Sequence, residues 1–190
     1  MLNESCIREA LAEWLMSNPN HKIRVFDELQ IGECIADIIS VTDCITGYEI
    51  KSDRDTYTRL NGQIKMYDKF CNFCYLVIGA KHIKSAGSKI PEHWGLILIS
   101  KKENKLSIEL LRKAQENKFA KLSNQLSLLW GNELSNITKR FQLSKQSMSK
   151  TQMKQKLLKS LIPNKLLLHI CDQLFERDYT AHRIMTKKTY

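Results

Sequence analysis

Residues 47–55 read GYEIKSDRD, and this stretch sets a glutamate and a lysine two positions apart inside a run of strand-forming residues. Successive side chains of a β-strand point to opposite faces, so Glu49 and Lys51 are expected to share one face and their neighbours the other. Apolar residues flank both positions, which indicates a largely buried sheet. A buried charge is costly unless it is paired, so this strand predicts a functional site.

A second carboxylate lies upstream, where Asp37 sits inside the apolar run IADIIS of residues 35–40. The turn-like TDCITG of residues 42–47 predicts a hairpin that brings Asp37 toward Glu49. Mg²⁺ typically takes one or two carboxylates and completes its shell with waters and phosphate oxygens. Such a site supports phosphodiester chemistry, with Lys51 acting on the attacking water or on the phosphate. The alternative is an ordinary solvated Glu–Lys pair, since Glu-x-Lys recurs by chance.

Hydrophobic periodicity outward from this hairpin predicts an α/β fold. The apolar spacing of Ile7, Leu11, Trp14 and Leu15 predicts a helix over residues 4–17, closed by Pro19. Strands are expected over residues 22–29, 34–42, 45–52 and 74–80, with a hairpin over 94–111. A helix is predicted over residues 56–70 with Asp55 and Thr56 as its N-cap, and a short helix over 82–90.

The chain changes character near residue 115. From residue 119 onward the pattern is helical, with Gly131 and Pro163 as the expected breaks, and residues 180–190 are expected to fray. Residues 1–118 hold 17 Lys and Arg against 16 Asp and Glu, whereas residues 119–190 hold 13 against 4. We therefore predict an α/β domain over 1–115 and a basic helical extension over 116–190, which favours a polyanionic partner. The alternative is a basic surface that serves only solubility.

The predicted order of helix, three-stranded meander, helix and strand resembles the core of the PD-(D/E)XK nuclease superfamily. Gln63 and Tyr67, four residues apart in QIKMY, resemble the Gln-x-x-x-Tyr pattern of its RecB-type branch. The segments IREALAEWL, GYEIKSDRDTYTRL, QIKMYDKF, YLVIGAKH and IPEHWGLILIS are similar to a small bacterial and phage family within that superfamily. The resemblance spans residues 5–100 and implies a restriction-endonuclease-like fold and a DNA nuclease that uses Mg²⁺ or Mn²⁺.

The resemblance also implies roles for individual residues. It assigns Asp37 and Glu49 to the metal and Lys51 to catalysis. It assigns Gln63 and Tyr67 to supporting the site or contacting the substrate strand. Where many superfamily members have Pro-Asp, this chain has Ala36-Asp37.

The roles of further residues around the predicted site are not decided by the sequence. Superfamily members often add a glutamate from the first helix, so the resemblance makes Glu9 and Glu13 candidates, with Glu28 from the first strand region as a further one. Arg54 and Arg59 flank the start of the helix of residues 56–70 and are expected phosphate contacts, because a helix N-terminus attracts anions. Plain surface charge is the alternative for both arginines.

The helical pattern of residues 126–161 resembles the SAP-type helix-extended-helix module that binds DNA. The expected backbone contacts, indifferent to base sequence and sensitive to salt, are Lys139, Arg140, Lys145, Lys150 and Lys154. A packing extension or a homodimer surface is the competing interpretation. For the whole chain, an RNA nuclease and an inactive nucleic-acid-binding protein on a nuclease fold remain alternatives to the DNA nuclease.

The six cysteines show no disulfide-framework spacing, which predicts reduced thiols and a cytoplasmic protein. Cys71-x-x-Cys74 supplies two thiolates where an iron–sulfur cluster needs four, so both are expected to be buried thiols. His82 and His93 have no companion ligands and are expected to be structural. No apolar run approaches the roughly 20 residues that span a bilayer, and the first residues lack a secretory signal, so no membrane partner is expected.

Overall fold

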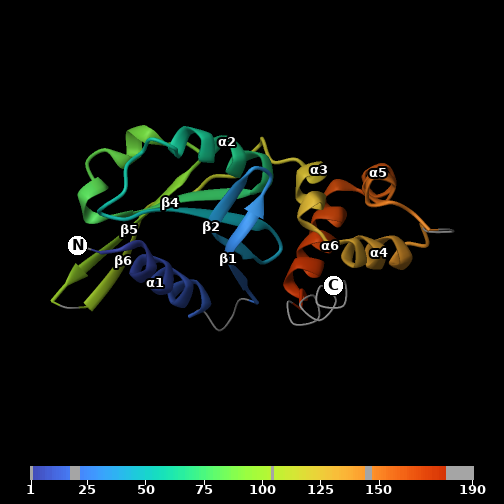
Figure 1. Ribbon diagram of the computed structural model, residues 1–190, viewed down its shortest axis with the longest axis horizontal. Helices are drawn as coiled ribbons and strands as arrows, with labels where there is room; N and C mark the ends of the chain where they lie inside the picture. The colour runs from blue at the N-terminus through green and yellow to red at the C-terminus, as the bar shows by residue number, and fades with distance from the viewer. Residues whose placement is uncertain (1, 18–21, 104, 144–146, 179–190) are drawn as a thin grey trace, which may run out of the picture.

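The predicted α/β class is confirmed by the computed structural model, which describes residues 2–17, 22–103, 105–143 and 147–178 (Figure 1). Six strands form one mixed sheet in the order of the sequence. They are β1 Arg24–Ile31, β2 Cys34–Val41, β3 Ile45–Lys51, β4 Phe73–Gly79, β5 Gly95–Lys102 and β6 Lys105–Arg112. Pairing is antiparallel from β1 to β3, parallel from β3 to β5, and antiparallel between β5 and β6.

Two helices, α1 Glu4–Met16 and α2 Leu60–Phe70, cover opposite faces of this sheet (Figure 1). Ile7 and Leu11 of α1 pack on Ile38, Tyr48 and Ile50. Strand side chains alternate between faces, so this contact turns the intervening residues of β3 toward α2. The charged residues of GYEIK therefore lie under α2.

Two expectations about helix limits and faces are wrong. Trp14 is expected on the buried face of the first helix but is 41% exposed. The buried face of α1 follows Ile7 and Leu11 toward Leu15, and Trp14 lies about 100° around the helix from Leu15. The second helix begins at Leu60 rather than at residue 56. Asp55 does not cap it, since its carboxylate instead accepts hydrogen bonds from Ser52 N–H at 2.7 Å and Ser52 Oγ at 2.6 Å. This closes a turn directly after β3.

The region between β4 and β5 holds two short 3₁₀ helices, η1 Ala80–His82 and η2 Ala86–Lys89. From residue 122 onward the described chain is mainly helical, as predicted. The elements are α3 Leu122–Gln125, η3 Leu126–Leu128, α4 Gly131–Arg140, α5 Lys150–Ser160 and α6 Pro163–Phe175. Gly131 and Pro163 are each the first residue of a helix, and Ser149 and Gln152 form a capping box for α5. Pro19 and residues 180–190 lie outside the described residues.

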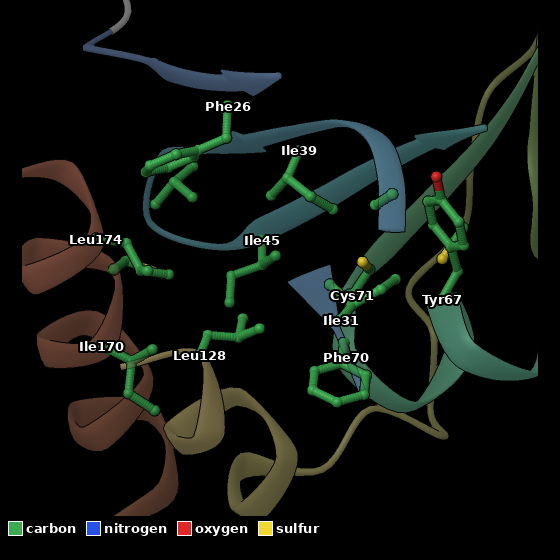
Figure 2. Packing of buried hydrophobic residues seen from close by; sticks show 14 of the residues in the cluster. Phe26, Ile31, Ile39, Ile45, Tyr67, Phe70, Cys71, Leu128, Ile170 and Leu174 are labelled. Atoms are coloured by element: carbon green, nitrogen blue, oxygen red, sulfur yellow. The ribbon is translucent and has the colours of Figure 1, made fainter. Parts of the chain in front are cut away.

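One hydrophobic cluster joins the later helices to the sheet. Phe26 and Ile45 from the strands face Leu128, Ile170 and Leu174 from η3 and α6 (Figure 2). The helices after β6 thus share a core with the sheet, and their division into a separate domain stays a prediction. Within the described ranges, no helix is long and apolar enough to cross a membrane.

Gly47 marks the close approach of β3 to α2. A Cβ at this position would lie 2.5 Å from Tyr67 Cδ1 and 2.8 Å from Cys71 Sγ, and both neighbours are buried. Gly47→Ala is expected to lower the free energy of unfolding by about 1–3 kcal/mol, measured by urea denaturation, because the core cannot absorb the added methyl group. Gly62→Ala is the matched control, since a Cβ there meets no atom within 4 Å and alanine favours a helix. Equal losses for both variants would contradict this reason.

Candidate functional site

The site begins where β2 and β3 separate. Their backbone pairing runs from Val41 opposite Ile45 to Ile38 opposite Tyr48, which sets Asp37 and Glu49 at the next position of the register. There Ile50 N–H donates to Asp37 Oδ2 at 2.7 Å, so a carboxylate takes the place of a backbone acceptor. The hairpin therefore brings the two predicted carboxylates together at the end of the ladder.

Glu49 and Lys51 share a face, as the strand period predicts. Lys51 Nζ lies 2.5 Å from Glu49 Oε1 and also donates to Gln63 Oε1 of α2 at 3.1 Å. The side chains of Glu49 and Lys51 are only 1% and 6% exposed. Glu49 Oε2 is buried and makes no hydrogen bond of normal length among the described residues, although the Tyr67 hydroxyl is close enough to lower the pKa of Glu49. A buried, unsatisfied carboxylate oxygen is costly, so this atom needs an explanation.

Tyr67 fixes the position of the two strands at the site. Its side chain is fully buried under α2, and its hydroxyl accepts a hydrogen bond from Asp37 N–H at 3.0 Å. The same hydroxyl donates to the carbonyl of Tyr48 at 3.2 Å. Gln63 and Tyr67 thus reach the site from successive turns of α2, so the structure brings together all five residues predicted for its centre.

Burial and like charge shape the ionisation of the two carboxylates. Burial raises the pKa of Asp37 to about 7, the negative charge of Glu49 adds to the rise, and the hydrogen bond from Ile50 opposes it. Burial also raises the pKa of Glu49, while the neighbouring Lys51 ammonium lowers it. Here two acids share one buried cation, and pKa values shifted by burial and by a neighbouring like charge are typical of functional sites. Further positive charge would favour both ionised forms.

Arg8 of α1 belongs to this cluster and was not predicted from the sequence. Its guanidinium binds Glu4 and lies 2.7 Å from Asp27 Oδ1 and 3.0 Å from Glu28 Oε1. It also lies 3.8 Å from Asp37 Oδ1, which links α1 to the site. The spacing of Glu4 and Arg8, four residues apart on one helix, is the sequence signal that could have drawn attention to it.

Among the three open glutamates, the structure connects Glu28 to the site. The register of β1 and β2 places Glu28 opposite Asp37, and its φ of 54° is unusual for a non-glycine residue. Glu9 instead lies near Ser5, whose hydroxyl donates to it at 3.2 Å, and Glu13 is exposed on α1. Backbone strain of this kind is often stored beside functional sites.

A groove of about 660 Å³ opens beside the charged cluster. Its lining residues are Glu33, Cys34, Ile35, Thr58, Arg59, Gly62, Gln63 and Met66. Burial raises the pKa of both the Cys34 thiol and Glu49, and the positive charge of Arg59 opposes each rise. Arg59 therefore acts on the groove and on the site together, whereas Arg54 is exposed on the loop that follows β3.

Candidate metal ligands are few. The described residues contain no group of three or more His, Cys, Asp or Glu side chains that could hold a metal ion. Asp37 and Glu49 are a pair, so metal binding by them stays a prediction. Cys71 and Cys74 are buried free thiols, as expected.

The two histidines have structural contacts, as expected. His82 Nε2 lies 2.9 Å from the Ser52 carbonyl, and His93 Nε2 lies 2.9 Å from Asp68 Oδ1.

The predicted nucleic-acid contacts of the later helices lie on α4 and α5. Lys139 and Arg140 are exposed in the last turn of α4, Lys150 is exposed at the start of α5, and Lys154 is half-buried on α5. Lys145 lies outside the described residues. In Figure 1, α4 and α5 lie beyond α6, on the side away from the sheet. These cations therefore form a region apart from α1 and β3.

The fold and the site define an α/β protein with a buried acid–lysine cluster at the split between two strands. The chain belongs to the family described as bacteriophage P4 protein cII, whose family model matches residues 1–188. No curated protein matches the chain. Among solved structures it is similar to the "SPO1766 protein of unknown function from Silicibacter pomeroyi", at 14% identity and a TM-score of 0.42. That match covers 67% of this chain and 85% of the other.

Proposed function

We propose that this protein is a metal-dependent nuclease with a restriction-endonuclease-like core that hydrolyses phosphodiester bonds in DNA. The observation that carries the proposal is the buried Glu49 Oε2, which makes no hydrogen bond of normal length among the described residues. The Glu49 carboxylate lies next to Asp37 in the strand register, and its other oxygen, Oε1, lies 2.5 Å from Lys51 Nζ. The order of α1, the β1–β3 meander, α2 and β4 supports the same proposal.

The donor set fits the protein's share of a Mg²⁺ or Mn²⁺ shell. Asp37 and Glu49 offer carboxylate oxygens, and Mg²⁺ usually takes only one or two carboxylates from a protein. When bound, the ion would polarise the phosphate and lower the pKa of a coordinated water. An added cation would also offset the burial penalty that raises the pKa of both acids.

The remaining residues orient and charge the site. Lys51 offers a buried ammonium to the phosphate or the attacking water, and Gln63 restricts its direction. Tyr67 holds the backbone of β2 against β3, which keeps Asp37 beside Glu49. Arg59 supplies positive charge at the mouth of the groove for the phosphates of the bound strand.

Outside the site, the basic helices would hold the nucleic-acid backbone in the manner of a SAP-like module. Lys139, Arg140, Lys150 and Lys154 would contribute contacts that weaken as salt is raised. RNA is an alternative substrate, since phosphodiester chemistry is common to both nucleic acids, and a homodimer is an alternative use of the helical surface. The six cysteines are free, in keeping with the expected cytoplasmic location.

A second candidate function is nucleic-acid binding without cleavage. The observation that favours it is the internal neutralisation of both acids, because Lys51 pairs with Glu49 and Arg8 lies 3.8 Å from Asp37. A scaffold of this kind can keep its fold and bind nucleic acid after catalysis is lost.

The test is cleavage of plasmid, linear duplex, single-stranded DNA and RNA with Mg²⁺, Mn²⁺ or EDTA. We expect metal-dependent cleavage that Asp37→Asn reduces by at least about 10–100-fold, the loss seen when residues that support metal ligands are changed. Asp43→Asn is the matched control, because Asp43 is exposed in the turn at the other end of the same hairpin. Undiminished cleavage by the Asp37 variant would contradict the proposal. Salt-sensitive binding without cleavage would favour the second candidate.

A further inference from the structure

The groove beside the site has two walls that come from distant parts of the sequence. The start of β2 and the turn before it supply Glu33, Cys34 and Ile35. The start of α2 and the residues before it supply the other wall, from Thr58 to Met66. Gln63 lines this groove and also accepts the hydrogen bond from Lys51, so the groove adjoins the proposed catalytic site across this one side chain.

The chemistry of the walls suits a flat, largely apolar group. Ile35 is 55% exposed, although it lies within a strand, and Met66 lines the opposite wall. Gly62 leaves the α2 wall open, since a Cβ there would meet no atom within 4 Å. Arg59 is the one cation among the described residues that line the groove, and Glu33 would repel a phosphate at its own wall. The groove therefore favours a base in its interior, with phosphates near Arg59 and Lys51.

Resting on the proposed function, we infer that the groove holds one unstacked base of the strand whose phosphate lies at Lys51, so the protein prefers single strands or unpaired ends. A base inside a duplex is stacked and paired and could not enter without being extruded. The volume of about 660 Å³ is within the usual range of small-molecule pockets and has room for a nucleoside. Flipped bases are held between aromatic or apolar side chains, and unpaired bases also stack on arginine planes.

Gly62→Phe tests this directly, because Gly62 lines the groove and a Cβ there meets no atom within 4 Å, so the added side chain competes with the base for the groove. Binding of a labelled single-stranded oligonucleotide and of the matching duplex is measured by fluorescence anisotropy in EDTA. We expect the variant to weaken single-strand binding by roughly fivefold, the lower end of the loss for one stacked base because the described lining residues include no aromatic side chain, and to leave duplex binding unchanged.

Two control variants separate groove filling from other effects. Gly62→Ala keeps the groove open, and Gly87→Phe adds the same ring at an exposed position of η2 where a Cβ also meets no atom within 4 Å. Both are expected to bind the single strand within about twofold of the wild type, and matching thermal melts show that all variants are folded. An unchanged single-strand affinity of Gly62→Phe, or an equal loss for duplex, would overturn the inference.

Binding and cleavage together separate the two proposals. Cleavage by the wild type with a Gly62→Phe variant that binds single strands normally would retain the nuclease and overturn the base pocket. Single-strand binding that depends on Gly62 without any metal-dependent cleavage would retain the pocket and overturn the nuclease. Absence of any binding to nucleic acid would overturn both.

Discussion

Lys51→Met is expected to lower the free energy of unfolding by about 3–5 kcal/mol, the usual result of removing one partner from a buried ion pair. Methionine keeps much of the length of lysine but leaves Glu49 without its paired ammonium, and Glu49 is only 1% exposed. Glu49→Gln is expected to have a similar effect, because the Lys51 ammonium would retain only neutral partners such as Gln63. Urea denaturation at pH 8 measures both losses.

The double variant Glu49→Gln with Lys51→Met makes this prediction specific. Replacing both charges leaves no uncompensated ion, so we expect it to regain most of the stability that each single variant loses. A matched control is the buried ion pair of Glu133 in α4 and Arg177, which follows α6. The Arg177 guanidinium lies 2.7 Å from Glu133 Oε2. Glu133→Gln should also destabilise but should not change the effect of Mg²⁺ on stability.

The pH gives an independent check on the cause. Burial raises the pKa of Glu49, and removal of Lys51 removes an influence that lowers it. Glu49 then becomes protonated more easily, so the loss in Lys51→Met should shrink as the pH falls. A loss below about 1 kcal/mol at pH 8 would show that Glu49 is not a buried charge, since exposed pairs contribute in that range.

The centre of the site could be predicted because it depends on short-range periodicity. A period of two placed Glu49 and Lys51 on one face, and the hairpin between β2 and β3 brought Asp37 to the same place. Helical spacing put Gln63 and Tyr67 on one face of the second helix, but only the resemblance to the nuclease superfamily implied that this face reaches the site. The strand residues required no knowledge of how distant elements pack, whereas the two helix residues did.

Features of the fold and of the site that depend on tertiary packing could not be predicted from the sequence. Arg8 reaches Asp37 only because Ile7 and Leu11 pack α1 against the sheet, and this placement leaves no local pattern beyond Glu4 and Arg8. The start of α2 was misplaced because Asp55 can serve a cap or a turn equally well, and Ser52 decides between them. The contact of Leu174 with the strand cluster likewise joins residues far apart in the chain.

Asp37→Asn is expected to raise the thermal stability of the metal-free protein at pH 8. In the folded state the pKa of Asp37 rises from 3.8 to about 7, so folding favours its protonated form. The stability that this group contributes is fully present below pH 3.8 and is lost as the pH rises through about 7. Asparagine does not ionise and can still accept the hydrogen bond from Ile50 N–H. The gain is at most about 4 kcal/mol, since one pKa unit corresponds to about 1.4 kcal/mol.

The same substitution should abolish stabilisation by metal. Mg²⁺ or Mn²⁺ would favour ionised Asp37 and Glu49, so the ion should raise the melting temperature of the wild type more at pH 8 than at pH 5. At a concentration of one hundred times Kd, a ligand that binds only the folded state adds about 2.7 kcal/mol. In Asp37→Asn we expect little of this rise, whereas Asp43→Asn should resemble the wild type at both pH values.

The two effects of Asp37→Asn have opposite signs, which separates a metal site from a merely structural carboxylate. A structural acid held by Arg8 and Ile50 would lose stability on conversion to asparagine at pH 8, with or without metal. A metal ligand that is poorly solvated in the free protein would gain stability without metal and lose the response to it. Differential scanning calorimetry at pH 5 and pH 8, with Mn²⁺ and with EDTA, distinguishes these outcomes. An equal metal response in the variant and the wild type would remove Asp37 from the proposed site.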